Sequence, residues 1–153
     1  MAHSLRAFRA EDSDGVKNLI LTILAREYPF DKSAYSDSDL ERIGETYGGK
    51  KDAFFVVDDG GQIVGTVGVK QETPDDALLR RLFVEPKHRK RGYGEALLRK
   101  AIEFCGKNGY KRVIFRCTDM MADAMKLCAK NGFKQTESLG VSGFNIHKLE
   151  LGL

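Results

Sequence analysis

The 153 residues predict one domain, 1–153, of the α/β (α+β) class: a mixed, mostly antiparallel central sheet of about six to seven strands with helices on both faces. Three observations predict this fold. Residues 58–61 (Asp-Asp-Gly-Gly) separate two strand-like runs and give a strong hairpin signal. Residues 78–117 have the pattern of a parallel strand–helix–strand crossover. The runs at 133–136 and 144–151 predict a closing antiparallel pair.

The first third of the chain predicts a strand and two helices. Residues 5–9 form the strand, and the acidic residues at 11–14 suit the start of a helix with apolar residues at helical spacing. This helix is expected to end near Glu27, because a proline follows two residues later. A second, more polar helix with a serine cap is expected within 36–47.

The middle of the chain predicts an antiparallel meander. Strands at 53–57 and 63–69 flank the hairpin turn, and 78–84 follows as the third strand. The apolar residues of this third strand do not alternate cleanly around Arg80 and Arg81. We therefore expect a β-bulge there.

Two amphipathic helices are expected in the second half. Residues 92–106 carry one apolar stripe, and 113–117 read as a buried strand after it. The next helix has a stripe at positions i, i+3, i+4 and i+7, which are Met121, Ala124, Met125 and Cys128. Both stripes are expected to pack on the sheet.

Composition narrows the class of protein. Hydrophobic residues make up 42% and charged residues 31%, and the net charge of +3 is too small for a general binder of nucleic acid or anionic membranes. The sequence contains no uninterrupted apolar run as long as a membrane span and no signal-peptide core, so a cytoplasmic protein is expected. Cys105, Cys117 and Cys128 lack metal-ligand spacing, which predicts reduced thiols and no metal.

Residues 87–94 carry the clearest chemical signal. Four cations lie there, namely Lys87, Arg89, Lys90 and Arg91. Gly92 and Gly94 follow at the start of a helix, where backbone N–H groups without helical partners and the macrodipole stabilise an anion. Glycine also lets a phosphate oxygen approach the backbone. We interpret the segment as a pyrophosphate cradle; the alternative is a solvated basic turn.

These residues resemble a known family. Residues 89–94 (Arg-Lys-Arg-Gly-Tyr-Gly) match the signature Arg or Gln, x, x, Gly, x, Gly or Ala of the GNAT N-acetyltransferase superfamily. Leu82, Val84 and Pro86 resemble the strand end that precedes it, and 124–133 resembles the second motif, Ala-x-x-Leu-Tyr-x-x-x-Gly-Phe. The resemblance covers nearly the whole chain. It implies a GNAT-like sheet with splayed parallel strands at its centre.

The resemblance also implies acetyl-CoA as the co-substrate. Its pyrophosphate is expected in the cradle, and its pantetheine arm is expected to pair with the bulged strand as an added strand would. The expected cofactor-binding residues are Leu82, Phe83, Val84, Arg89, Lys90, Arg91, Gly92, Tyr93, Gly94 and Glu95.

The catalytic residues are less well determined. At the position where the family commonly has a proton-donating tyrosine, this chain has Cys128. This cysteine is either a catalytic acid, a small buried hydrophobe or a redox-reactive thiol. Glu27, Asp31 and Glu72 are the candidates for a general base acting through water, with a solvated surface carboxylate as the alternative for each.

The acceptor side has three expected substrate-binding residues. Arg81, together with its neighbour Arg80, is placed to face the acceptor and would favour a substrate with a carboxylate. The alternative is that both arginines cover the sheet edge or pair with nearby aspartates. Tyr28 and Phe30 are expected to line the acceptor side, or else to clamp the first helix on the sheet.

The leading functional hypothesis is an N-acetyltransferase acting on a primary amine of a small molecule or amino acid. The alternatives are acetylation of a protein N-terminus or lysine, and a non-catalytic acyl-CoA-binding regulatory module. Nucleic-acid binding is disfavoured because no aromatic residues interleave the cations of 87–91 in a stacking pattern. A homodimer is possible, since many members of the family pair through their last strands.

Overall fold

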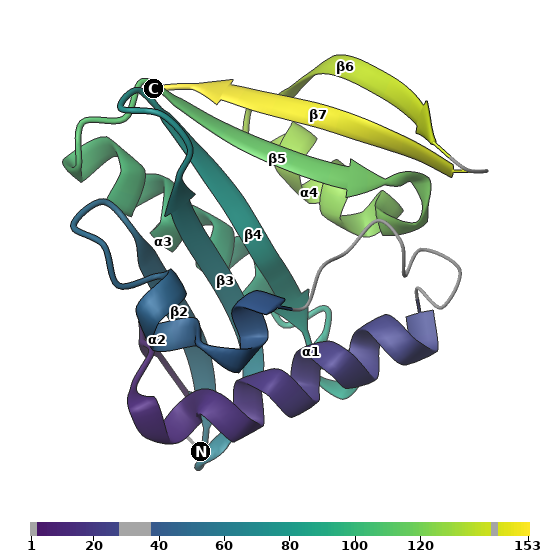
Figure 1. Cartoon of the computed structure of the whole chain (residues 1–153). Coiled ribbons are helices and arrows are strands. Elements are labelled where there is room, and N and C mark those ends of the chain that lie inside the picture. Colours follow the sequence, from purple (N-terminus) through teal and green to yellow (C-terminus); the bar gives the residue numbers. More distant parts are fainter. Residues whose placement is uncertain (1–2, 28–37, 142–143) are drawn as a thin grey trace.

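The computed structural model describes residues 3–27, 38–141 and 144–153. Its centre is a seven-stranded sheet in the order β1-β2-β3-β4-β5-β7-β6, in which β4 and β5 are parallel and all other neighbours are antiparallel (Figure 1). This is the mixed, mostly antiparallel sheet that the sequence predicts. The β4–α3–β5 crossover supplies the parallel pair, as a connection that contains a helix allows.

The strands are β1 (His3–Ala7), β2 (Ala53–Asp59), β3 (Gln62–Gln71), β4 (Asp76–Val84), β5 (Arg112–Thr118), β6 (Lys134–Val141) and β7 (Phe144–Gly152). The helices are α1 (Ser13–Glu27), α2 (Ile43–Thr46), α3 (Tyr93–Lys107) and α4 (Ala122–Lys130). Short 3-10 turns are η1 (Ala10–Asp12), η3 (Ser38–Glu41), η4 (Pro86–His88) and η5 (Asp119–Met121).

Most predicted elements are confirmed, and three differ. The first strand is His3–Ala7, two residues earlier than the predicted 5–9. The polar helix expected within 36–47 is a 3-10 turn followed by the single helical turn α2. Strand β6 runs to Val141, beyond the predicted 133–136. Its residues are exposed along most of its length, so no apolar alternation marks them, and pairing with β7 along the whole strand defines it instead.

The two central strands separate halfway along. The parallel ladder joins Asp76–Leu79 of β4 to Arg112–Phe115 of β5 and ends there. Beyond that point β4 stays paired with β3, up to the pair Val84 and Gly65, while β5 stays paired with β7 (Figure 1). The splayed parallel strands expected from the family resemblance are therefore present.

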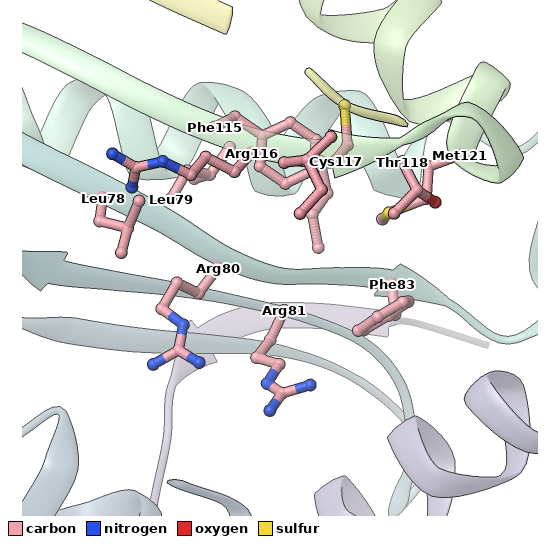
Figure 2. A pocket seen from close by; sticks show the side chains of 12 residues that line it. Leu78, Leu79, Arg80, Arg81, Phe83, Phe115, Arg116, Cys117, Thr118 and Met121 are labelled. Atoms are coloured by element: carbon pink, nitrogen blue, oxygen red, sulfur yellow. The ribbon is translucent and has the colours of Figure 1, made fainter. Parts of the chain in front are cut away.

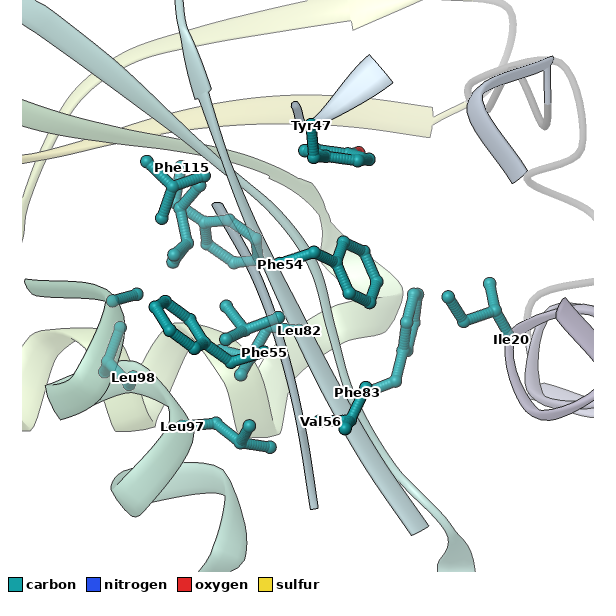
Figure 3. Close-up of a cluster of buried hydrophobic side chains, with 14 of the residues drawn as sticks. Ile20, Tyr47, Phe54, Phe55, Val56, Leu82, Phe83, Leu97, Leu98 and Phe115 are labelled. Carbon is teal, nitrogen blue, oxygen red and sulfur yellow. The ribbon is translucent and has the colours of Figure 1, made fainter. Parts of the chain in front are cut away.

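The core has two layers, one on each face of the sheet. Alternate residues of a strand point to opposite faces, so neighbouring apolar residues serve different layers. Figure 3 shows Phe55 and Leu82 beside the α3 residues Leu97 and Leu98, whereas Phe83 points toward Ile20 of α1. Tyr47 and Phe54 pack on the α1 side with ring centroids 5.0 Å apart. Helix α3 therefore covers one face of the sheet and α1 covers the other. The splayed ends of β4 and β5 lie in the sheet between them.

Candidate active site

The space opened by the splayed strands is a cavity of about 260 Å³ (Figure 2). Its walls come from β4, from the end of β5 and from two residues beyond them. The lining residues are Leu78, Leu79, Arg80, Arg81, Leu82, Phe83, Phe115, Arg116, Cys117, Thr118, Met121 and Ile146. The walls are mostly apolar, and three guanidinium groups supply their charge.

A β-bulge turns two neighbouring arginines to the same side of the sheet. The β3–β4 register shifts between Thr66, which pairs with Phe83, and Gly68, which pairs with Arg80. Arg81 lies in the shifted stretch with φ 55°, a left-handed backbone that a long side chain rarely adopts. Its carbonyl accepts a hydrogen bond of 2.7 Å from the Thr66 hydroxyl. The bulge expected from the sequence is confirmed, and it points Arg80 and Arg81 the same way (Figure 2).

Asp39 anchors Arg81 on the α1 side of the sheet. The Arg81 guanidinium donates from Nε at 3.0 Å and from Nη2 at 2.5 Å to the two carboxylate oxygens, and the Tyr47 hydroxyl donates to the same carboxylate at 2.7 Å. Burial raises the pKa of Asp39, but the hydrogen bonds from Arg81 and Tyr47 and the positive charges of Arg81 and Arg80 outweigh it and hold the pKa below its usual value. The cluster is a buried ion pair with its charges matched.

Gly68 makes room for this arrangement. A Cβ at Gly68 would lie 2.8 Å from the Tyr47 ring and 3.1 Å from the Phe54 ring, so a larger residue would push the Tyr47 ring off the sheet. The ring position in turn brings its hydroxyl to Asp39. The orientation of the Arg81 side chain thus depends on a glycine of the neighbouring strand.

Arg80 is placed differently from Arg81. Its side chain is 30% exposed, against 4% for Arg81, and its Nη2 lies 3.8 Å from Asp39. Arg116, the third arginine of the cavity, is 43% exposed and pairs with Glu72 at 3.1 Å. Glu72, one of the candidate bases, therefore meets an arginine and does not line the cavity. Of the three guanidiniums, that of Arg80 is held by the longest contact.

The loop after β4 presents backbone to open space. Gly92 is the N-cap of α3 with φ 84°, and a Cβ built on it would meet nothing within 4 Å. Ala96 donates to the Gly92 carbonyl at 3.0 Å, so Gly94 and Glu95 precede the first α-helical hydrogen bond. Amides in such a first turn point away from the helix and have no helical acceptor. The left-handed conformation at Gly92 explains why glycine stands there.

The cations of this loop fall into two groups. Arg89 donates to both carboxylate oxygens of Glu27, at 2.8 and 2.7 Å, and from Nε to the Val84 carbonyl at 3.0 Å. The other cations, Lys87, Lys90 and Arg91, are exposed, and among the described residues none of them has an ion pair within 4.0 Å. Arg89 thus ties the loop to the end of α1, and the remaining cations face solvent.

The other expected cofactor residues also have defined positions. Leu82 and Phe83 line the cavity, while Val84 ends β4. Tyr93 is buried and stacks on His88 with ring centroids 6.4 Å apart. The Glu95 side chain accepts a hydrogen bond from Asn131, which links α3 to α4; this bond, with nearby cations, lowers the pKa of Glu95.

The two catalytic candidates lie outside the cavity wall. Cys128 is fully buried, and this burial raises the pKa of its thiol to about 12. Glu27 lines a different cavity, of about 600 Å³, beside α1, where both its oxygens are bound by Arg89. The thiol that does line the splayed cavity belongs to Cys117, whose pKa burial raises to about 11. Tyr28, Phe30 and Asp31 lie outside the described residues.

Sequence reasoning missed several residues of the cavity wall. Phe115, Cys117 and Thr118 reach it because β5 ends beside the diverging half of β4, and Ile146 because it pairs with Thr118. These residues follow only from the strand order β4-β5-β7, which pairs distant segments. The apolar run at 113–117, interrupted by Arg116, was the available signal, and by itself it indicated only a strand.

Two features fit a coenzyme A thioester: the cradle at 87–94 and a slot, namely the edge of β4 from Arg80 to Val84 that faces β5 beyond the parallel ladder. The open space at Gly92, the amides of the first turn of α3 and three exposed cations suit a diphosphate. The β5-facing edge of β4 beyond Leu79 is outside the parallel ladder and suits an extended arm with amide groups. Among the described residues no cluster of His, Cys, Asp or Glu is arranged for a metal ion. None of the described helices combines the length and hydropathy needed to cross a bilayer.

Comparisons with known proteins agree with this geometry. Residues 18–133 match the model of the "Acetyltransferase (GNAT) family". "N-acetyltransferase 8" of Rattus norvegicus is 36% identical over 83 residues, 50% of this chain and 37% of that protein. "N-acetyltransferase 8" of Homo sapiens is 32% identical over 107 residues, 65% of this chain and 46% of that protein. The chain thus spans less than half the length of these curated relatives.

Solved structures share the fold. A GNAT-family acetyltransferase from Staphylococcus aureus superposes with a TM-score of 0.83 over 99% of both chains, at 20% identity, a level at which the likeness shows the fold alone. The family match covers most of the chain, including the splayed strands β4 and β5 and the glycine-containing loop at 85–92 between β4 and α3. On this evidence the chain belongs to the GNAT acetyltransferase family.

Proposed function

We propose that this protein is an N-acetyltransferase that transfers the acetyl group of acetyl-CoA to a primary amine of a small molecule or amino acid. The observation that carries the proposal is the divergence of β4 from β5 at the strand end that leads into the open amino end of α3. This arrangement places an anion site at the amino end of α3 next to a slot along β4. Family membership supports acetyl transfer as the reaction class.

The chain's own groups would hold the cofactor in three ways. The first-turn amides of α3 and the space in front of Gly92 receive the diphosphate, and Lys87, Lys90 and Arg91 add Coulomb attraction. The unpaired edge of β4 at Leu82 and Phe83 positions the arm. When bound, the cofactor supplies an activated acyl group as a thioester.

The cavity then positions an amine against that acyl group. The cavity volume of about 260 Å³ lies below the usual range of ligand pockets, and the cavity also has to admit the end of the arm, which favours a small acceptor over a polypeptide segment. Holding the two reactants together removes much of the entropic cost of a bimolecular reaction. In the transfer, a nitrogen–carbon bond forms, the carbon–sulfur bond breaks with its electron pair remaining on sulfur, and the amine loses one proton to water.

The walls favour the neutral, nucleophilic form of the amine. A free alkylammonium has a pKa of about 10 and must lose a proton before it attacks. No carboxylate or imidazole among the described residues lines the cavity, but Arg80, Arg81 and Arg116 do. Nearby positive charge lowers the pKa of a bound ammonium, although Asp39 beside Arg81 and Glu72 beside Arg116 offset part of this effect. The remaining positive charge makes it easier for the amine to lose its proton to water.

Neither catalytic candidate from the sequence has a chemical step in this proposal. The Cys128 thiol has a pKa of about 12, so transfer of its proton to a departing thiolate of ordinary pKa is unfavourable in free energy. Glu27 is held by Arg89 away from the cavity. The thiolate can leave without an acid, because its conjugate acid is only moderately weak.

A second candidate function is a non-catalytic acyl-CoA-binding module. The observation that favours it is the lack of a titratable acid or base of ordinary pKa among the described residues that line the cavity. Such a module would use the same cradle and slot to bind the thioester. It would differ from the enzyme in releasing no coenzyme A when amines are added.

Release of free thiol from acetyl-CoA tests the proposal. Purified protein is incubated with acetyl-CoA and a panel of amino acids and other small primary amines, and in parallel with peptides bearing a free N-terminus or lysine. Turnover with small amines supports the proposal, and turnover with peptides alone would replace it by protein acetylation. Stabilisation by acetyl-CoA without thiol release from any amine would instead establish the binding module.

A further inference from the structure

The charge of the splayed cavity has one sign. Among the described residues that line it, Arg80, Arg81 and Arg116 are charged, and no aspartate or glutamate is present. The rest of the wall is largely apolar, with leucine, phenylalanine, methionine and isoleucine side chains. A ligand that complements this wall carries a negative group and an apolar body.

The three arginines are not equally available. Arg81 is 4% exposed and donates to both oxygens of Asp39, so its charge is matched within the protein. Arg116 has a carboxylate partner in Glu72 at 3.1 Å. Arg80 is 30% exposed, and its ion pair is a 3.8 Å contact with an Asp39 carboxylate that already binds Arg81 and Tyr47. Arg80 can therefore bind a ligand without breaking a short ion pair.

The surroundings fix the position of Arg80. The bulge puts it beside Arg81 on one face, and the Arg81–Asp39–Tyr47 cluster holds that part of β4 against η3 and α2. An arginine with a planar fork of donors binds a carboxylate through two parallel hydrogen bonds. The site therefore has a held strand, an available fork and an apolar wall beside it.

We propose that the acceptor is an amine that also carries a carboxylate, such as an apolar α-amino acid, and that Arg80 binds this carboxylate. The inference rests on the proposed function and adds the substrate class. Of the two arginines that the sequence placed on the acceptor side, it makes Arg80 the ligand-binding one in place of Arg81. Arg81 acts as a positioning residue that holds the bulge through Asp39.

Matched pairs of amines test the substrate class. L-leucine, L-methionine and L-phenylalanine are compared with their amides, which keep the amine and the side chain and carry a neutral carboxamide in place of the carboxylate. A hydrogen-bonded charge pair of this kind corresponds to roughly a ten- to hundredfold preference in kcat/KM for the acids. Equal kcat/KM for the acids and their amides would overturn the proposal.

Variants of Arg80 test the residue. We expect Arg80→Ala to lower kcat/KM for the acids by roughly ten- to hundredfold and to leave that for the amides nearly unchanged, with partial recovery in Arg80→Lys. Arg42→Ala, which removes an arginine that is 75% exposed and outside the cavity, is the control and should behave as wild type. Equal losses for acids and amides in Arg80→Ala would overturn the proposal.

Ligand binding without turnover keeps the inference separate from the proposed function. The melting temperature is measured with N-acetyl-L-leucine and with N-acetyl-L-leucinamide, in wild type and in Arg80→Ala. A larger stabilisation by the acid that disappears in Arg80→Ala supports the carboxylate site, even if no amine is acetylated and the enzyme proposal fails. Equal shifts with the two ligands would overturn the site, whatever the turnover assays give.

Discussion

The two ends of the site use different chemical groups, backbone at one end and side chains at the other. The amino end of α3 is made of backbone: a left-handed Gly92, first-turn amides and space in front of them. The face at the β4 bulge is made of side chains, in which Arg81, Asp39 and Tyr47 form a buried network. The backbone amides of α3 offer hydrogen-bond donors that suit any phosphate-like anion. The selectivity of the face at the bulge depends on which side chains surround it.

This difference predicts how each end responds to substitution. A backbone site fails when a side chain blocks it, even if the protein stays folded. A buried ionic network fails when one partner is removed, because the remaining charge lies in a low-dielectric environment without compensation. The first kind of loss should appear in cofactor binding and the second in stability, and the following experiments separate the two.

The largest effect is expected from Asp39→Ala. This change leaves the guanidinium of Arg81, which is 4% exposed, without its partner. Removing one member of a buried pair typically lowers the free energy of unfolding by about 3–5 kcal/mol. Urea unfolding measures it, and Glu45→Ala is the matched control, since Glu45 is 77% exposed and pairs with Arg42 at 3.6 Å. Similar losses in both variants would show that Asp39 does not anchor the bulge.

The Asp39–Arg81 pair also makes the free energy of unfolding depend on pH in the acid range. The folded-state pKa of Asp39 lies below its usual value, so its contribution is complete above the unfolded value of about 3.9 and is lost as pH falls through the folded pKa. Wild type should therefore lose part of its unfolding free energy below about pH 4, and Asp39→Asn should lose less over the same interval. Parallel curves for the two proteins would contradict this account.

Gly92→Leu is expected to act on binding. Leucine at a left-handed position costs about 1–2 kcal/mol of stability, and its side chain fills the space in front of the α3 amides. We predict at least a hundredfold weaker acetyl-CoA affinity, seen as loss of the thermal shift. Gly109→Leu is the control at the other end of the helix, with φ 79° and the same open surroundings. If both variants keep the shift, the cradle is not the binding site.

Glu27→Gln should have a smaller effect, because it weakens the link between Arg89 and α1 without blocking the amides. The side chain of Glu27 is 29% exposed and that of Arg89 is 36% exposed, and an ion pair that solvent reaches contributes little energy. We therefore expect about a fivefold weaker affinity for acetyl-CoA and little change in kcat. Titration calorimetry and steady-state kinetics measure the two quantities. A hundredfold fall in kcat at unchanged affinity would instead identify Glu27 as the general base.

The smallest effect is expected from Cys128→Ala. The thiol is fully buried and lies outside the cavity wall, so kcat should stay within about threefold of wild type, with an unchanged pH profile. Cys105→Ala is the matched control, since Cys105 is also buried and burial raises its pKa to about 12. A drop in kcat of more than a hundredfold for Cys128→Ala alone would make this thiol the catalytic acid.

The same contrast explains what could be predicted from the sequence. Three features are local sequence signals: the hairpin turn at 58–61, the glycines after the cations of 87–91, and the apolar stripe of α3. The loss of apolar alternation around Arg80 and Arg81 indicated the bulge. The backbone part of the site therefore follows from neighbouring residues. The carboxyl end of β6 and the helix near Tyr47 did not follow, since pairing and packing define them.

The side-chain part depends on contacts between distant residues. Asp39 meets Arg81 across 42 positions of the chain, and Glu27 meets Arg89 across 62. Periodicity and spacing carry no information about such pairs. The sequence could therefore name Arg81 and Glu27 as chemically capable groups, but only the fold shows that each already has a partner and that Arg80 is the more available arginine.

We propose that the amino end of α3 and the adjoining slot bind a coenzyme A thioester. Calorimetric titration of the wild-type protein with acetyl-CoA tests it most directly. We expect saturable binding of one molecule per chain, with a dissociation constant of about 1 µM to 1 mM, the range of ordinary substrate constants. Absence of heat and of saturation at millimolar acetyl-CoA would contradict it.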